Sequence, residues 1–209
     1  MKPPLPSKTL TVVQKMSGKG PILLNEEVTV CPLCGKKTFN IKEYIYNTPG
    51  FGNILITVGI CTSCGYKFRD VKLAEPGKPK QIIVRVESEK ELRYMVLKPA
   101  YAAVIIPEQD LEMLPGPASQ GFISTVEGVL YRFEEAVKIA CSNIESSEQR
   151  KKCEELESWI RRAIDGLERF TLIICDYEGA GKVVGENVVE ETLSGRCLEI
   201  KPDWLELKM

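Results

Sequence analysis

Alternation between apolar and polar positions, with many aromatic and β-branched residues, marks the N-terminal third of the chain. Phe39–Tyr46 and Ile54–Ile60 have this character and flank the turn-forming cluster Asn47–Asn53, an arrangement that is typical of a β-hairpin. Strand character continues over Tyr66–Leu73, and the prolines and glycine of Glu75–Lys80 then break it. The pattern therefore predicts a small β module that ends at residue 74.

Short strands separated by proline and glycine also fill most of the remaining chain. This spacing predicts an all-β layer, either a sandwich or a barrel-like sheet. The predicted strands are Gln81–Glu87 with its extension Glu91–Leu97, Ala102–Ile106, Leu111–Leu114, Phe170–Cys175, Lys182–Val184, Val188–Val189 and Cys197–Ile200.

Between these strands the apolar period changes from two residues to three or four, which indicates helices. Ser124-x-x-Glu127 and Ser146-x-x-Gln149 are capping boxes that predict the two helix starts, and the short polar connector predicts an antiparallel helical hairpin over residues 125–169. We predict a mainly β chain with an inserted α-helical hairpin, an α+β fold. Its parts are an N-terminal extension (1–25), a ribbon module (26–74) and a β domain (75–209).

Two matched cysteine motifs carry the strongest chemical signal. Cys31-Pro-Leu-Cys34-Gly35 is followed by Cys61-Thr-Ser-Cys64-Gly65, with 26 residues between Cys34 and Cys61. Two residues between the cysteines let both sulfurs reach one ion at about 2.3 Å, and the glycine permits a backbone that turns amides toward the thiolates. Because four thiolates fill a tetrahedral shell, we predict one structural Zn²⁺ held by Cys31, Cys34, Cys61 and Cys64.

Other chemistry is open to the eight cysteines. An iron–sulfur cluster also accepts four cysteines, whereas two redox dithiols require a thioredoxin-like βαβ setting that the pattern lacks. The chain begins without an apolar signal segment, so we expect a reducing, cytoplasmic compartment, where metal binding is favoured over disulfides. The remaining cysteines are predicted to be small buried apolar residues: Cys141, Cys153, Cys175 and Cys197.

Composition narrows the possible functions. The chain has no histidine, which removes the commonest general base and the usual activated nucleophiles, so we expect no enzyme. The net charge of -1 hides an asymmetry, because residues 1–72 carry 10 Lys/Arg against 4 Asp/Glu while residues 73–209 carry 18 against 25. This mild basic bias is too small to predict a nucleic-acid-binding protein.

Together these residues resemble the ZPR (ZPR-one type) zinc-finger family, and the chain looks like a single archaeal-type copy. The resemblance runs from Glu26 to Thr192. It includes both cysteine motifs, Cys64-Gly-Tyr-Lys67, the region of Arg93 and Lys98, Ile106-Pro-Glu108 and the most family-specific block, Gly121-Phe-Ile-Ser-Thr-Val-Glu-Gly128. The resemblance implies a zinc ribbon followed by a double-stranded β-helix domain that a helical hairpin interrupts. Eukaryotic members carry two tandem copies, bind translation elongation factor one-alpha and assist its folding, so it also implies this factor as the partner.

One segment departs from the family pattern. Where family members have a segment like Asp-Pro-x-x-Asn-Ser, this chain has Asp176-Tyr-Glu-Gly-Ala-Gly-Lys182, in which only Asp176 matches. If that loop grips the elongation factor, the departure implies altered binding.

Three hypotheses of function follow. The first is a zinc-dependent binding or folding factor for the elongation factor, with Phe51 and Phe122 either as partner contacts or as ordinary packing residues. The second is a nucleic-acid-binding zinc ribbon that uses Lys36, Lys37, Lys42, Lys67, Arg69 and Lys72 with Tyr44, Tyr46 and Phe51. The third, an enzyme with Asp176, Glu178 and Lys182 as acid–base groups, lacks a histidine or an open metal position to support it.

Overall fold

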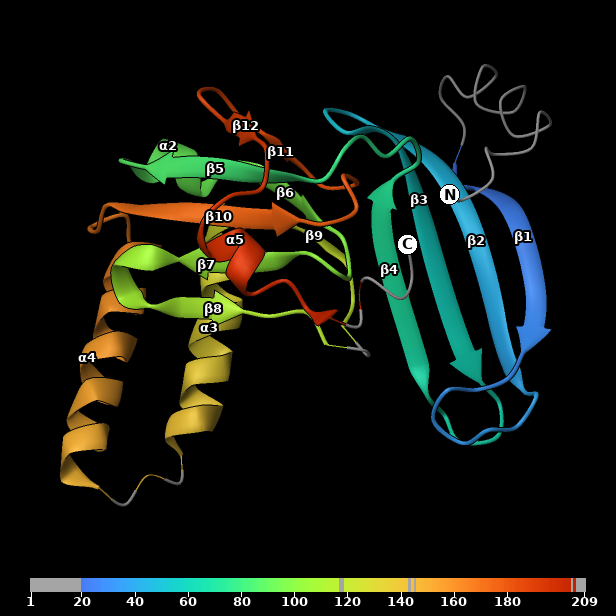
Figure 1. Ribbon diagram of the computed structural model, residues 1–209, viewed down its shortest axis with the longest axis horizontal. Coiled ribbons are helices and arrows are strands. Elements are labelled where there is room, and N and C mark those ends of the chain that lie inside the picture. The colour runs from blue at the N-terminus through green and yellow to red at the C-terminus, as the bar shows by residue number, and fades with distance from the viewer. Residues whose placement is uncertain (1–19, 117–118, 143, 145, 204, 206–209) are drawn as a thin grey trace.

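Four antiparallel strands form the N-terminal module in the computed structural model, which describes residues 20–116, 119–142, 144, 146–203 and 205. Each strand pairs with the next one in the chain. They are β1 (Ile22–Thr29), β2 (Phe39–Thr48), β3 (Gly52–Cys61) and β4 (Lys67–Leu73) (Figure 1). The β2–β3 hairpin predicted from the turn cluster is confirmed, and β1 adds a fourth strand at its edge. Residues 1–19 of the N-terminal extension lie outside the described residues.

Two further sheets form the second module. One has the order β12-β5-β10-β7-β8 and the other the order β11-β6-β9. β10 lies between β5 and β7 and is antiparallel to both, with Phe170 opposite Val86 and Ile173 opposite Ile105. The strands are β5 (Lys80–Val86), β6 (Met95–Lys98), β7 (Ala103–Ile106), β8 (Leu111–Met113), β9 (Phe122–Thr125), β10 (Phe170–Asp176), β11 (Lys182–Val184) and β12 (Val189–Glu191). The mainly β fold class is therefore confirmed.

The helical hairpin closes the apolar core of this second module. It consists of α3 (Val126–Cys141) and α4 (Ser147–Ile164), and the predicted apolar stripe of α3 is buried at Val126, Leu130 and Phe133. These side chains pack with Leu172 and Ile174 of β10 in one continuous cluster. Aliphatic and aromatic side chains thus fill the interior of the second module.

The structure corrects two of the predicted strands. Glu91–Leu97 divides into the end of a short helix, α2 (Glu89–Leu92), and then β6, because Ser88 and Glu91 form a capping box. Cys197–Ile200 lies mostly in another short helix, α5 (Arg196–Glu199). Its apolar residue Cys197 is buried by packing in an apolar cluster and not by pairing in a sheet. The remaining short element is the 3₁₀ helix η1 (Pro107–Gln109).

The capping predictions for the long helices are also wrong in detail. α3 begins one residue later than its predicted box, and Thr125 caps it by accepting a hydrogen bond from the Gly128 amide at 3.0 Å. Ser146 does precede α4, but its side chain makes no capping hydrogen bond. Ser124 is instead paired within β9, opposite Val96.

The four cysteines predicted to be small buried apolar residues form two disulfides, and only Cys175 and Cys197 are buried. Cys141 and Cys153 form a disulfide with Cα atoms 6.0 Å apart, which ties the end of α3 to the first turns of α4. Cys175 and Cys197 form a second one, with Cα atoms 5.4 Å apart, which ties β10 to α5. The partners are 12 and 22 residues apart in sequence, so only the folded arrangement of these elements brings them together.

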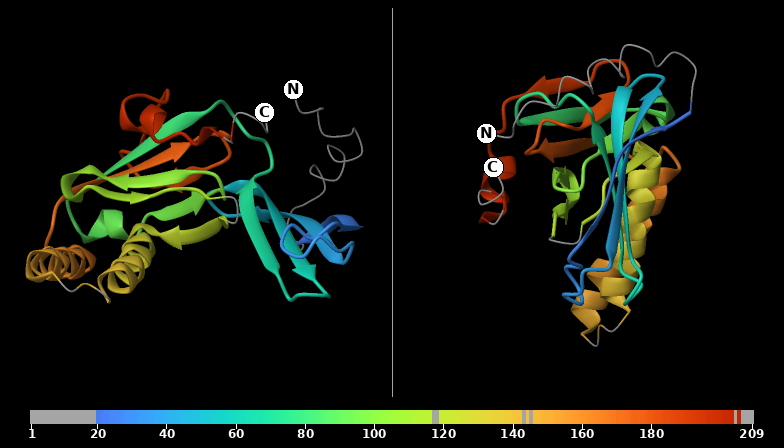
Figure 2. Two further views of the ribbon diagram at one scale, coloured as in Figure 1. Left: turned by 60° about the horizontal axis from the view of Figure 1, so that its bottom comes forward. Right: turned by 90° about the vertical axis from the view of Figure 1, so that its right-hand side faces the viewer.

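The ribbon sheet packs against the second module through a mixed seam (Figure 2). Its apolar part joins Phe51, Ile54 and Val71 of the ribbon to Leu97 of β6. Phe51 is only 7 % exposed, so its role as a packing residue is the one that the structure supports. The two modules thus share an apolar cluster instead of being joined by a linker alone.

Two buried charged residues complete the seam. Asp70 of β4 accepts a hydrogen bond from the Ala100 amide at 2.9 Å, and Lys98 donates to the carbonyls of Pro99 and Ala100 at 3.0 and 3.4 Å. Burial lowers the pKa of Lys98 to about 8, and burial raises the pKa of Asp70 above its ordinary value. These groups hold the 98–100 turn against the ribbon.

Gly121 lies where the backbones of the two modules meet most closely. A Cβ atom there would collide with Asp70 Oδ1 and lie 2.8 and 2.9 Å from the Val71 amide nitrogen and carbonyl oxygen. We expect Gly121→Ala to lower the free energy of unfolding by about 1–3 kcal/mol, because rigid backbone cannot yield to the added methyl group. Urea unfolding followed by circular dichroism measures this.

Gly116→Ala is the matched control for this substitution. A Cβ atom at Gly116 would meet the Ser119 hydroxyl at an ordinary 3.8 Å. Equal unfolding free energies for the two variants would show that the close approach at Gly121 has no energetic importance.

Candidate metal centre

The two cysteine motifs form matching loops at one end of the ribbon. The first precedes β2 and the second follows from the last residue of β3. In each loop the glycine amide donates to the carbonyl of the first cysteine, Gly35 to Cys31 at 2.9 Å and Gly65 to Cys61 at 3.0 Å. Both glycines have positive φ, 70° and 74°, a conformation that side-chain-bearing residues rarely adopt. The glycine predicted from the sequence pattern is therefore required by the turn.

The antiparallel pairing of β2 and β3 brings the loops together. Phe39 pairs with Cys61 at the end of the ladder, and the Thr62 amide donates to the Thr38 carbonyl at 3.0 Å. The four cysteine sulfurs consequently lie within 4.8 Å of one another. Cysteines that are 27 and 33 residues apart in sequence become neighbours, with 3.7 Å between Cys34 and Cys61 sulfurs and between Cys31 and Cys64 sulfurs.

These sulfur distances fit a single tetrahedral ion. Four sulfurs bound at about 2.3 Å to zinc are spaced by about 3.8 Å along the edges of the tetrahedron, close to the observed 3.7 Å. A disulfide requires about 2.05 Å, and an iron–sulfur cluster would place several iron atoms between the sulfurs and spread them further. The four cysteines are thus positioned to bind one metal ion, and their geometry fits zinc.

Repulsion among the thiolates explains why these four sulfurs suit a cation. Thr38 donates a hydrogen bond to Cys61 Sγ over 3.2 Å and lowers the pKa of Cys61 to about 6. For Cys64 a hydrogen bond from the Tyr66 backbone acts downward, but desolvation and the neighbouring cysteine sulfurs outweigh it and raise the pKa of Cys64 to about 12. The Cys61 thiol thus loses its proton readily, and the negative charge that forms there disfavours the loss of a proton from the neighbouring thiols. A divalent cation removes this repulsion and allows all four thiolates to form.

Packing around the sulfurs makes this centre part of the ribbon. Cys31 and Cys61 are each 1 % exposed and pack with Phe39, while the ring of Tyr66 lies 5.6 Å from that of Phe39. Four protein sulfurs leave no position for water or substrate on a tetrahedral ion. The centre suits a structural role in holding β2, β3 and the two loops together.

The other residues considered as chemical groups do not converge on one site. Asp176 is fully buried and accepts a hydrogen bond from the Gly181 amide at 2.6 Å, and burial raises the pKa of its carboxyl. Glu178 lies 4.0 Å from Lys72, whereas Lys182 donates to the Gly50 carbonyl at 2.8 Å. Asp176 therefore stabilises its own turn, and Lys182 ties that segment to the ribbon hairpin.

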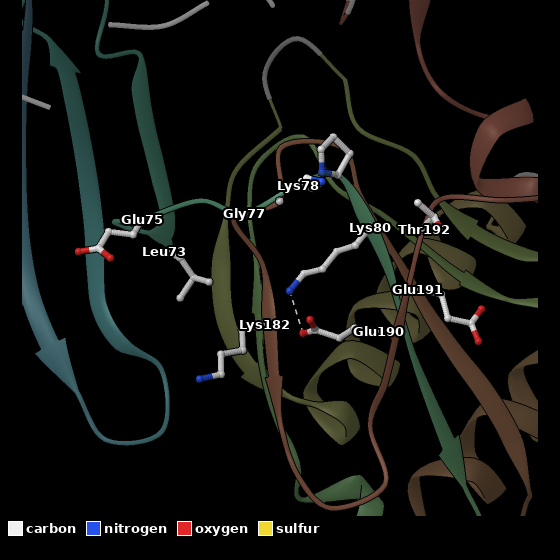
Figure 3. A pocket seen from close by; sticks show the side chains of 11 residues that line it. Leu73, Glu75, Gly77, Lys78, Lys80, Lys182, Glu190, Glu191 and Thr192 are labelled. Carbon is white, nitrogen blue, oxygen red and sulfur yellow. Dashed lines mark ion pairs between the residues drawn. The ribbon is translucent and has the colours of Figure 1, made fainter. Parts of the chain in front are cut away.

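An open cavity of about 570 Å³ lies beside this turn (Figure 3). The Lys80–Glu190 ion pair, with a 2.8 Å separation, spans it, and Lys182 lines it. Its other lining residues are Leu73, Glu75, Gly77, Lys78, Pro79, Gly179, Glu191 and Thr192. Lysines and glutamates are mixed around the opening, so its charge selects neither an anion nor a cation.

Four of the nine residues proposed for nucleic-acid binding make contacts within the protein. Lys42 pairs with Glu26 at 3.0 Å, and Lys72 faces Glu178. Tyr46 and Phe51 pack in the seam between the modules. Sequence reasoning also missed the Arg132 guanidinium, which lies 4.0 Å from the ring centre of Phe122; an exposed arginine on a helix has no local signal for such stacking.

Comparisons with known proteins agree with this architecture. Residues 90–193 match the family model described as the ZPR1 jelly-roll domain. An uncharacterised ZPR1-like protein of Methanocaldococcus jannaschii is 41 % identical over 170 residues, which cover 81 % of this chain and 86 % of that protein. A second, from Pyrococcus horikoshii, is 32 % identical over 186 residues and 83 % of each chain. The zinc finger chaperone zpr1 of Schizosaccharomyces pombe is 27 % identical over 154 residues, which cover 70 % of this chain and 33 % of that protein.

Proposed function

Because the chain belongs to the ZPR1 family, we propose that it is a zinc-containing factor that binds a client protein and assists its folding. The name of the fission yeast relative, a zinc finger chaperone, supports this class of activity. We further propose that the client is translation elongation factor one-alpha, which the family resemblance implies. The protein then acts by stoichiometric binding and needs no catalytic residue.

The filled interior of the jelly-roll domain is the observation that carries this proposal. Leu130, Ile160, Leu172 and Ile174 are each 0 % exposed and pack in one cluster between the sheets and the helical hairpin. The metal centre likewise offers four sulfurs and no open position. With the sheet interior occupied and the metal shell complete, recognition falls to the outer surface, as in a protein that binds another macromolecule.

A cytoplasmic site of action forms part of the same proposal. None of the helices that the structure describes combines the length and apolar character needed to cross a bilayer. An elongation factor works where proteins are synthesised, so its folding factor must share that compartment.

We expect purified, zinc-loaded protein to bind purified archaeal elongation factor one-alpha at both 0.1 and 0.5 M salt. Apolar contacts persist at high salt, whereas binding by phosphate neutralisation weakens steeply. Isothermal titration calorimetry measures the affinity, and recovery of GTP binding by denatured factor, with and without this protein, measures folding assistance. Protein stripped of zinc is the matched control.

Two results would contradict the proposal. One is the absence of binding to the factor at either salt concentration. The other is capture from a native lysate that nuclease treatment and 0.5 M salt both abolish, which would favour the alternative of a nucleic-acid-binding zinc ribbon.

A further inference from the structure

One face of the ribbon sheet continues beyond the seam without a cover. Val71 belongs to this face and packs on the jelly-roll domain. Two residues earlier on β4, Arg69 lies opposite Val58, and Lys67 lies opposite Ile60, so these side chains share the face of Val71. Ile60 is 52 % exposed, and Val28 on the same face of β1 is 50 % exposed. The sheet face thus changes from a packed surface to an open apolar and basic one.

Helix α3 extends toward the same end of the molecule as this open face. Figure 1 shows the helical hairpin and the ribbon extending toward the same end of the molecule, and Figure 2 shows the same relation from another side. The contact between Gly121 and Val71 joins β9 to β4. Phe122, the next residue, carries the guanidinium of Arg132 from α3 over its ring at 4.0 Å. Arg132 is therefore held over β9, the strand that contacts β4 of the ribbon.

Three cations on β4 and α3 differ from their neighbours in having no carboxylate partner. Lys42, on the same sheet face, pairs with Glu26 at 3.0 Å, and Lys138 of α3 pairs with Glu134 at 2.8 Å. Within the part of the chain that the structure describes, Lys67, Arg69 and Arg132 form no ion pair. Stacking on Phe122 also fixes the Arg132 guanidinium, whose donors suit a carboxylate.

We propose that this surface, the ribbon–helix face, docks an extended acidic segment of a client protein; this inference rests on the proposed function. The face consists of Val28, Val58, Ile60, Lys67, Arg69 and Arg132. Its cations complement an acidic segment, and its exposed apolar side chains are aliphatic rather than the aromatic platforms that stack on bases. β4 ends the order of its sheet, and the second module contacts its edge at Val71 and Leu73. A segment that alternates acidic and aliphatic residues can therefore add beside Lys67–Arg69 and place aliphatic side chains on the open face.

The probe for this surface is a fluorescein-labelled peptide in which glutamate alternates with valine, measured by fluorescence anisotropy. We expect the zinc-loaded protein to bind it, and Arg69→Glu/Arg132→Glu to weaken binding at least tenfold. Arg85→Glu/Lys151→Glu makes the same charge change at exposed positions elsewhere and should stay within twofold of the unaltered protein. Zinc content and the circular dichroism spectrum of each variant establish that it folds.

A second pair of variants tests the apolar part of the face. Ile60→Ser should weaken binding of the same peptide severalfold. Leu167→Ser, at a position that is 71 % exposed between α4 and β10, should leave binding unchanged. Equal peptide affinities for these two variants would show that the apolar side chains do not contribute to binding, and would overturn the proposed docking of aliphatic side chains on this face.

Other outcomes separate this inference from the proposed function. Equal peptide binding by the unaltered protein and Arg69→Glu/Arg132→Glu, no peptide binding at all, or preferential binding of a uridylate decamer would each overturn the docking surface. If the peptide binds as expected but the elongation factor does not, the surface stands and the proposed client is wrong. If the factor binds equally to the unaltered protein and the double arginine variant, the client stands and the surface is wrong.

Discussion

Cys61→Ser is expected to abolish stoichiometric zinc binding and to unfold the ribbon, because structural zinc contributes on the order of 10 kcal/mol to the folding of small modules. Cys61 is the buried last residue of β3 and receives a hydrogen bond from Thr38, so serine removes both a ligand and the sulfur around which the two loops close. Three remaining cysteines cannot complete the tetrahedral shell without water. Metal content by inductively coupled plasma mass spectrometry measures the loss.

Circular dichroism can distinguish loss of the ribbon from loss of the whole fold. The described helices all lie in the second module, whose apolar core does not include the metal centre. The helical signal of Cys61→Ser should therefore persist while strand content falls. Ser63→Ala alters the same loop without removing a sulfur and should keep full zinc stoichiometry. Retention of one zinc per chain in Cys61→Ser would refute the ligand set Cys31, Cys34, Cys61 and Cys64.

The features that could be predicted from the sequence are those encoded by neighbouring residues. A tight metal-binding loop requires two cysteines at fixed spacing and a following glycine. The motif can therefore be recognised from five consecutive residues, as at Cys31–Gly35. The α3 stripe is likewise local, since residues three and four apart share one helical face. These signals anticipated the fold class and the convergence of the four cysteines.

Features that depend on distant segments could not be predicted. Gly121 is required because the backbone of Val71, 50 residues earlier, lies against it, and a single glycine before a strand gives no sign of such a neighbour. The apolar residues of Cys197–Ile200 predict a strand, whereas the structure has the short helix α5 there. The position of the Arg132 guanidinium depends on stacking over the ring of Phe122, which belongs to β9 and not to the helix of Arg132.

The two disulfides show most plainly how tertiary structure can overrule a local interpretation. Neither pair has a motif, and the expectation of a reducing compartment argued against them. Yet α3 and α4 are antiparallel, so Cys141 and Cys153 face each other across the hairpin. Disulfides are rare in most cytoplasmic proteins, although those of hyperthermophilic archaea are rich in them.

Removal of both disulfides is expected to lower the free energy of unfolding by about 6 kcal/mol, from about 3 kcal/mol for each closed loop of this size. The loops span 12 and 22 residues, and without the bridges the unfolded chain regains the entropy that they remove. Urea unfolding of Cys141→Ser/Cys153→Ser, of Cys175→Ser/Cys197→Ser and of the fourfold variant measures each contribution. The paired substitutions avoid reductant, so the metal-binding thiols stay unchanged.

Alkylation and mass spectrometry test the bridges themselves. Denatured protein treated with chelator but no reductant should expose four alkylatable thiols, those of the metal centre, and adding reductant should raise the number to eight. In the native state, Cys175 and Cys197 are 0 % and 2 % exposed, while Cys141 and Cys153 are half-buried, so mild reductant should open the hairpin bridge first. Eight reactive thiols before reduction would mean that the cysteines are unbridged, and the stability of the jelly-roll domain would then rest on its apolar core alone.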